Sequence, residues 1–104
     1  MNKNEWEKVY EMLEKFHSDF NSAYPEYKNG RNNQVRKAAE SKVNSSIALA
    51  RSHVERSPEI LGLISSSKFG HTFAYDEFWQ ARYFGRDMSE FLSLMKQHIA
   101  SLPS

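Results

Sequence analysis

The chain has 104 residues, of which 39% are hydrophobic and 13% are aromatic, and its formal net charge is +1. This length supports one hydrophobic core, so we expect a single domain over residues 1–104. The near-neutral charge excludes a global field that would direct the chain to nucleic acid or to an anionic membrane. The absence of cysteine excludes disulfides, thiolate metal sites and a cysteine nucleophile.

No stretch approaches the ~18 uncharged apolar residues that span a bilayer. The N-terminal residues also lack the apolar run of a signal peptide. We therefore expect a cytoplasmic protein with no membrane partner.

The first predicted helix covers residues 5–23. At about 100° per residue, one side of this segment is apolar and the opposite side is mostly charged. The apolar side consists of Trp6, Val9, Tyr10, Leu13, Phe16, Phe20 and Ala23. We expect Asn4 to cap the helix, with Glu7 completing a capping box. Pro25 is expected to prevent the helix from continuing.

Residues 25–33 have the composition of a turn, and their Asn29-Gly30 pair favours a positive φ. Asn32 or Asn33 then caps a second predicted helix that ends near Glu55. Because its inward face has mostly small side chains, a neighbouring helix can approach closely, and we expect this helix near the centre of the bundle. The inward face consists of Ala39, Val43, Ser46, Ile47, Ala50 and Val54.

Ser57 and Pro58 predict the start of a short third helix, with serine as the cap and proline in the first helical position. This helix is expected to end in the serines at 65–67, followed by a loop over residues 67–74. The last predicted helix covers residues 75–101. Its apolar stripe consists of Ala81, Phe84, Met88, Phe91, Leu92, Met95 and Ile99.

Gly85 lies beside this stripe, where its missing side chain could admit the backbone of a neighbouring helix. No sustained alternation typical of a strand is present in the sequence. The sequence therefore predicts an all-α fold, a compact antiparallel bundle of three long helices and one short helix.

Signatures of catalysis and metal binding are weak. His17, His53 and His98 fall at the edges of apolar helix faces, as expected for histidines whose ring tips reach solvent, and His71 falls in the predicted loop. Glu14 and His17 have the i, i+3 spacing of di-iron bundles, but the second pair that such a site needs is missing. We expect no metal and no cofactor. An enzymatic function stays open, although the sequence favours a non-catalytic protein.

The favoured functional surface is a set of aromatic and arginine side chains near the C-terminus. Tyr75, Trp79, Arg82 and Arg86 follow i, i+4, i+7, i+11 spacing, and Tyr83 flanks them. On one helix they would form a face opposite the apolar stripe. Because Trp, Tyr and Arg dominate binding hot spots, this face predicts a partner protein or self-association. The alternative is that Trp79 belongs to the core.

A second candidate surface is basic. Residues 31–56 carry six basic and two acidic side chains, a net charge of +4. The basic residues that gather around the turn and the start of the second helix are Lys28, Arg31, Arg36, Lys37 and Lys42. Such a cluster could follow the phosphates of a nucleic acid, although a solvated helix face is the favoured explanation.

The sequence thus favours a non-catalytic adaptor, inhibitor or immunity-type protein that binds another protein, or itself, through a helical surface. The alternative is a nucleic-acid-binding or nucleic-acid-processing accessory protein that uses the basic residues between positions 28 and 42. A third possibility is that the chain is one module of a larger protein.

Overall fold

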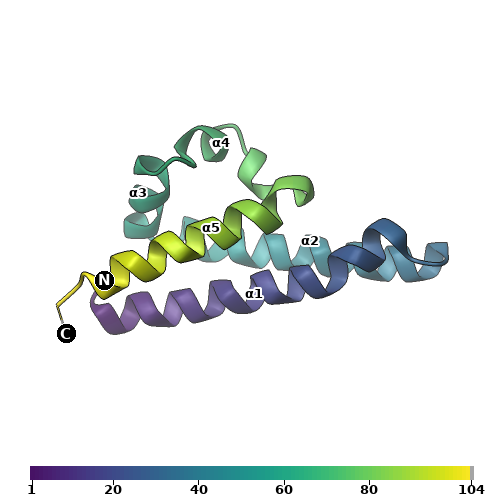
Figure 1. Ribbon diagram of the computed structural model, residues 1–104, viewed down its shortest axis with the longest axis horizontal. Helices are drawn as coiled ribbons and strands as arrows, with labels where there is room; N and C mark the ends of the chain where they lie inside the picture. Colours follow the sequence, from purple (N-terminus) through teal and green to yellow (C-terminus); the bar gives the residue numbers. More distant parts are fainter. Residues whose placement is uncertain (104) are drawn as a thin grey trace.

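The computed structural model describes residues 1–103, which fold into helices with no strand among them. The helices are α1 (Lys3–Asn29), α2 (Asn33–Glu55), α3 (Pro58–Ser66), α4 (Gly70–Ala74), the 3₁₀ helix η1 (Glu77–Trp79) and α5 (Ala81–Ala100). The first two form a long hairpin, α5 lies along one side of it, and the short helices connect α2 to α5 (Figure 1). The predicted all-α helical bundle is confirmed.

The N-terminal end of α1 differs from the prediction. The cap is Asn2, whose side chain accepts a hydrogen bond from the backbone N–H of Glu5 at 2.8 Å. The Glu5 carboxylate accepts one from the backbone N–H of Asn2 at 3.3 Å, which completes a capping box. The predicted cap at Asn4 with Glu7 is therefore wrong, and the helix begins earlier.

The C-terminal end of α1 also differs, because Pro25 lies inside the helix, which continues to Asn29. A proline removes the backbone N–H that would bond the carbonyl of residue i−4. That carbonyl belongs to Asn21, and both residues are exposed, so water can replace the missing donor. Because Ala23 and Gly30 on either side of the proline are buried, packing stabilises the helix through this position.

The second helix begins and ends as predicted. Asn32 caps it by accepting a hydrogen bond from the backbone N–H of Val35 at 2.9 Å, and every residue of the predicted inward face is buried. The predicted positive φ at Gly30 is wrong, since its φ is −57°. Glycine is required there for space: a Cβ would lie 2.5 Å from the carbonyl oxygen of Glu26 and 2.8 Å from Cγ of Arg36.

The connection between α2 and α5 is more helical than predicted. Ser57 caps α3 and Pro58 occupies its first turn, as expected. The predicted loop over 67–74 is wrong in its second half, where α4 lies, and the last helix begins at Ala81 and not at residue 75. The cause is Asp76, whose left-handed backbone (φ 61°) interrupts the helix. Arg51 Nη2 lies 3.0 Å from Asp76 Oδ1 and fixes this bend against α2.

The last helix runs antiparallel to α1. The ring centroids of Trp6 and His98 are 4.6 Å apart, and Nε2 of His17 lies 2.8 Å from the carbonyl oxygen of Gly85. A Cβ on Gly85 would lie 3.1 Å from Cε1 of Phe20. The space at Gly85 is therefore occupied by a side chain of α1, and the expected approach of a neighbouring backbone is wrong.

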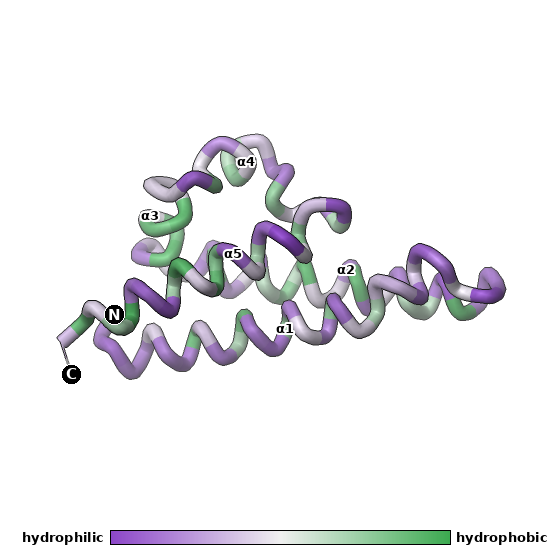
Figure 2. Tube along the Cα trace, viewed as in Figure 1, coloured by the Kyte–Doolittle hydropathy of each residue, from purple (hydrophilic) through white to green (hydrophobic). Residues whose placement is uncertain are grey.

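The hairpin extends beyond α5, which gives an elongated molecule of 50 × 26 × 20 Å. Helix α1 has 27 residues and α5 has 20, and α5 begins beside Phe20, so the loop end of the hairpin projects alone (Figure 1). Hydropathy alternates along both hairpin helices, as expected for amphipathic helices (Figure 2). Over residues 1–103, no helix is both long and apolar enough to cross a membrane.

Replacing Gly30 by alanine is expected to lower the free energy of unfolding by about 1–3 kcal/mol, because the new methyl group would overlap the Glu26 carbonyl and Arg36. Gly62→Ala is the matched control, since Gly62 is exposed in α3 and nothing lies within 4 Å of its missing Cβ. Its better helix propensity should raise the stability by up to ~1 kcal/mol. Urea unfolding followed by circular dichroism measures both changes. Changes of the same sign and size would contradict the packing assigned to Gly30.

Candidate functional site

The structure does not bring the predicted aromatic and arginine residues together on one helix face. Tyr75 is the C-cap residue of α4 and Trp79 lies in η1, whereas Arg82, Tyr83 and Arg86 belong to α5. The guanidinium carbons of Arg82 and Arg86 lie 5.4 and 5.9 Å from the centre of the Tyr83 ring. The prediction of a single helical face is therefore wrong, because the helix that would carry it is broken at residue 76.

Trp79 belongs to the hydrophobic core. It is 6% exposed, and its ring contacts those of Phe73, Phe78 and Phe84 at centroid distances of 4.9 to 6.1 Å. The guanidinium of Arg51 lies 5.9 Å from the centre of the Trp79 ring. Trp79 thus holds η1 against α5 and α2, and it is not available to a partner.

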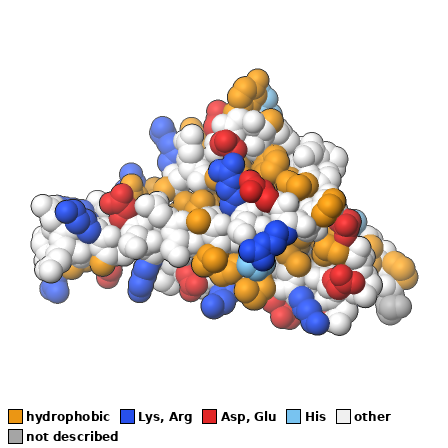
Figure 3. All heavy atoms as spheres, turned by 180° about the vertical axis from the view of Figure 1, so that it is seen from behind, with side chains coloured by type: hydrophobic (Ala, Val, Ile, Leu, Met, Phe, Trp, Pro, Cys, Tyr) orange, Lys and Arg blue, Asp and Glu red, His pale blue; other side chains and the backbone are white. Residues whose placement is uncertain are grey.

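The basic residues lie around the turn of the hairpin and along the start of α2, and Figure 3 shows Lys and Arg side chains at this projecting end. Lys28 Nζ lies about 6 Å from the ring centres of Tyr24 and Tyr27. Arg36 closes the turn by donating hydrogen bonds to the carbonyl oxygen of Gly30, at 2.7 Å, and to Asn33 Oδ1. The other basic residues, Arg31, Lys37 and Lys42, are exposed. Lys42 also lines a groove between the two helices.

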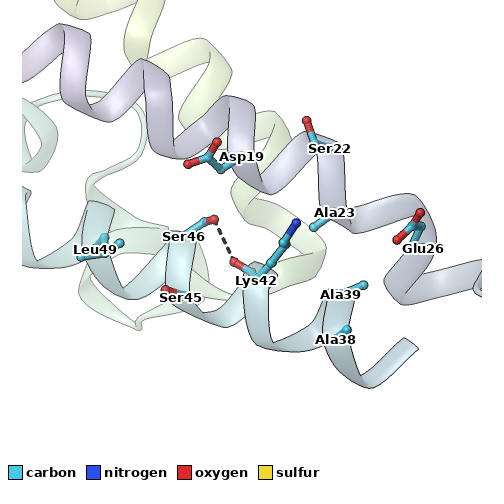
Figure 4. A pocket seen from close by; sticks show the side chains of 10 residues that line it. All are labelled: Asp19, Ser22, Ala23, Glu26, Ala38, Ala39, Lys42, Ser45, Ser46 and Leu49. Atoms are coloured by element: carbon cyan, nitrogen blue, oxygen red, sulfur yellow. Dashed lines mark hydrogen bonds between the residues drawn. The ribbon is translucent and has the colours of Figure 1, made fainter. Parts of the chain in front are cut away.

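That groove lies between α1 and α2 and has a volume of about 500 Å³. It is lined by Asp19, Ser22, Ala23, Glu26, Ala38, Ala39, Lys42, Ser45, Ser46 and Leu49. Figure 4 shows these side chains on the two helices of the hairpin, with α5 behind them. His17 contacts α5, and Asp19 follows it by two residues. Because two residues turn a helix by about 200°, Asp19 lies on nearly the opposite side of α1. The groove therefore faces away from α5.

Small side chains form the groove. The adjacent pairs Ala38-Ala39 and Ser45-Ser46 are seven residues apart on α2, so they repeat on the same side of the helix. The hydroxyl of Ser46 donates a hydrogen bond to the carbonyl oxygen of Lys42 at 2.8 Å, which satisfies its polar group within the helix. The hydroxyl hydrogen of Ser46 is therefore already paired within α2.

Apolar and charged side chains border this floor. Leu49 is 45% exposed at one end of the groove, and Met12 is 38% exposed. Met12 precedes Asp19 by seven residues, so it lies on the same side of α1. The α1 border also carries Glu26, and the α2 border carries Lys42. We call the groove and these bordering residues the hairpin face.

The other charged clusters lie outside the hairpin face. Lys68 Nζ contacts Glu90 Oε2 at 2.9 Å, and this hydrogen bond lowers the pKa of the Glu90 carboxyl. The side chain of Asp87 is buried, and its Oδ1 accepts a hydrogen bond from Nε of Arg86 at 3.0 Å. In the described part of the chain, no group of three His, Asp or Glu side chains is placed to hold a metal ion.

The comparisons with known proteins do not assign a family. No protein-family model matches the chain, and neither a curated protein nor a solved structure matches it. The function is therefore argued from the geometry of the hairpin face.

Sequence reasoning recognised only part of this face. It placed Ala39 and Ser46 on the inward side of the second helix, which is correct. It did not use their neighbours Ala38 and Ser45, which extend the small-residue surface outward. The repeat of two small residues every seven positions was the available signal for this surface.

Trp79→Ala is expected to reduce the free energy of unfolding by about 3–5 kcal/mol, because it removes a buried ring that contacts three other aromatic rings. The exposed Arg82 provides the control, since Arg82→Ala should change the stability by less than about 0.5 kcal/mol. Thermal and urea unfolding measure both variants. A Trp79→Ala protein as stable as the wild type would contradict the core assignment.

Proposed function

We propose that this protein is a non-catalytic, cytoplasmic protein-binding module that docks a helical surface of its partner on the hairpin face. The observation that carries the proposal is the groove between α1 and α2, which has small side chains along its floor, has Leu49 exposed at its end and faces away from α5. Such an adaptor, inhibitor or immunity-type protein would act through contact alone.

The packing of helices supports this proposal. Helices approach most closely where the facing side chains are small, and typical interaxial distances are about 8–10 Å. A partner helix resting on the Ala and Ser floor could bring its own apolar residues against Leu49 and Met12. Covering the exposed part of a leucine contributes about 1 kcal/mol. One partner helix on this side would make a four-helix arrangement together with α1, α2 and α5.

Nucleic-acid binding is the second candidate, and the projecting end of the hairpin favours it. From residue 24 to residue 42 the chain carries five basic and two acidic side chains, a net charge of +3. Because α5 does not cover this end, a phosphate backbone could approach it from several sides (Figure 3). The role of Arg36 in closing the turn leaves Arg31 and Lys37 as the principal candidates for phosphate contact.

Leu49→Glu is expected to abolish partner binding, because it places a charge on the apolar end of the groove. Ala48→Glu is the matched control, as it adds the same charge to the adjacent, exposed position that does not line the groove. Tagged wild-type protein and both variants are used for affinity capture from the host after nuclease treatment. A partner retained by the wild type and Ala48→Glu but absent with Leu49→Glu supports the proposal. The same partners with all three proteins would contradict it.

The nucleic-acid hypothesis makes a separate prediction. Replacing Arg31 and Lys37 together by alanine should weaken binding and reduce the dependence of log K on log[salt] by about 2, close to one unit for each phosphate-binding side chain removed. Fluorescence anisotropy with a labelled oligonucleotide over a range of salt concentrations measures this slope. Affinity that does not depend on salt in the wild type would count against this candidate.

A further inference from the structure

We propose that the hairpin face binds a second copy of this chain, antiparallel to the first, about a two-fold axis that passes close to Leu49. This inference rests on the proposed protein-binding function and names the partner. It is carried by the order of charges along α1, by the position of the exposed apolar side chains, and by the charge of the projecting hairpin end.

Four of the exposed charges on the groove side of α1 change from basic to acidic along the helix. Lys8, Lys15, Asp19 and Glu26 follow spacings of seven, four and seven residues, so they lie on one side of the helix, and all four are exposed. The two lysines lie toward the N-terminus and the two carboxylates toward the C-terminus. Glu5, which the same seven-residue spacing places on this side, and the nearby Glu11 lie among the lysines, so the N-terminal half is mixed in charge and the half beside the groove is negative.

This order is self-complementary for an antiparallel pair. If α1 packs against α1 of the partner subunit with the axis midway between positions 15 and 19, Lys15 faces Asp19 of the partner subunit. The same arrangement places Lys8 opposite Glu26 of the partner subunit, because both pairs of residue numbers have the same midpoint. Symmetry repeats each pairing, which gives four opposite-charge contacts between the two α1 helices.

The same axis brings the exposed apolar side chains together. The ring centroids of Phe16 and His53 are 5.2 Å apart, and α2 runs antiparallel to α1, so Leu49 lies within about one turn of the level of position 17. Leu49 is therefore close to Leu49 of the partner subunit, with Met12 of each copy nearby. Water is excluded from the most apolar part of the face, and the charges lie on either side of it.

A parallel arrangement is less favourable. An axis parallel to the helices would place Asp19 and Glu26 opposite Lys42 of the partner subunit, which is attractive. It would also place the two projecting basic ends side by side, each with a net charge of +3 over residues 24–42. The antiparallel arrangement keeps these ends at opposite poles of the dimer, so their repulsion is small.

The size of the face matches that of a specific interface. Helix α1 has 27 residues, which corresponds to a length of about 40 Å, and two adjacent helices are roughly 20 Å wide. The face therefore offers up to roughly 800 Å² per protomer, the area of a standard protein–protein interface.

Sedimentation velocity of the purified wild-type protein, from micromolar to millimolar concentration, tests the proposal. The wild type should show a monomer–dimer equilibrium. Asp19→Lys should raise the dissociation constant roughly tenfold, since two attractive pairs become repulsive. The double variant with Lys15→Asp added should recover the wild-type value, because both charges are then exchanged.

Glu7→Lys is the control for Asp19→Lys, because Glu7 is exposed on another side of α1 and the change in charge is the same. Circular dichroism verifies that all variants keep the helical content of the wild type. A wild type that stays monomeric throughout would overturn the proposal, as would a dimer whose Asp19→Lys variant is not restored by Lys15→Asp. Either result leaves the comparison of Leu49→Glu with Ala48→Glu to decide the proposed protein-binding function separately.

Discussion

Close packing between α1 and α2 is the constraint on which the rest of the molecule depends. The buried face of α2 consists mainly of small or β-branched side chains, which allow α1 to pack closely against it. This packing keeps α1 helical through Pro25. It also closes the turn around Gly30, where a Cβ would overlap the carbonyl oxygen of Glu26. The aromatic residues of the short helices and of α5 then cover only one side of the hairpin.

The unequal lengths of the helices determine where function can lie. Because α5 is shorter than α1 and begins beside Phe20, it leaves the projecting end of the hairpin without a neighbour. Because α5 packs on the opposite side of the hairpin, it does not cover the small-residue groove. The two surfaces have different chemistry: the projecting end is basic, whereas the hairpin face combines a small-residue floor, Leu49 and charges of both signs.

Much of the fold follows from local sequence signals. The caps at Asn32 and Ser57 and the buried residues of α2 and α5 were predictable, because capping chemistry and helical periodicity are properties of a few neighbouring residues. The errors arose where distant contacts override local preference. Pro25 is tolerated because packing on both sides stabilises the helix, and Asp76 adopts a left-handed conformation that an ion pair with Arg51 stabilises.

The candidate site was less predictable for the same reason. The spacing of Tyr75, Trp79, Arg82 and Arg86 indicates a surface only if one helix carries all four, and the break at Asp76 places Trp79 in the core. The hairpin face, by contrast, depends on which side of two helices a third one leaves open. Its repeat of small residues is visible in the sequence, but periodicity does not reveal that α5 packs on the opposite side.

The most direct test of the central claim uses the absence of cysteine in this chain. In an otherwise unchanged protein, Leu49→Cys places a single thiol beside the proposed two-fold axis, and Ala48→Cys places one at the adjacent position outside the groove. Disulfide formation under mild oxidation is followed by non-reducing electrophoresis. The account predicts rapid formation of a covalent dimer with Leu49→Cys and not with Ala48→Cys. Equal rates for the two variants, or no dimer with either, would contradict it.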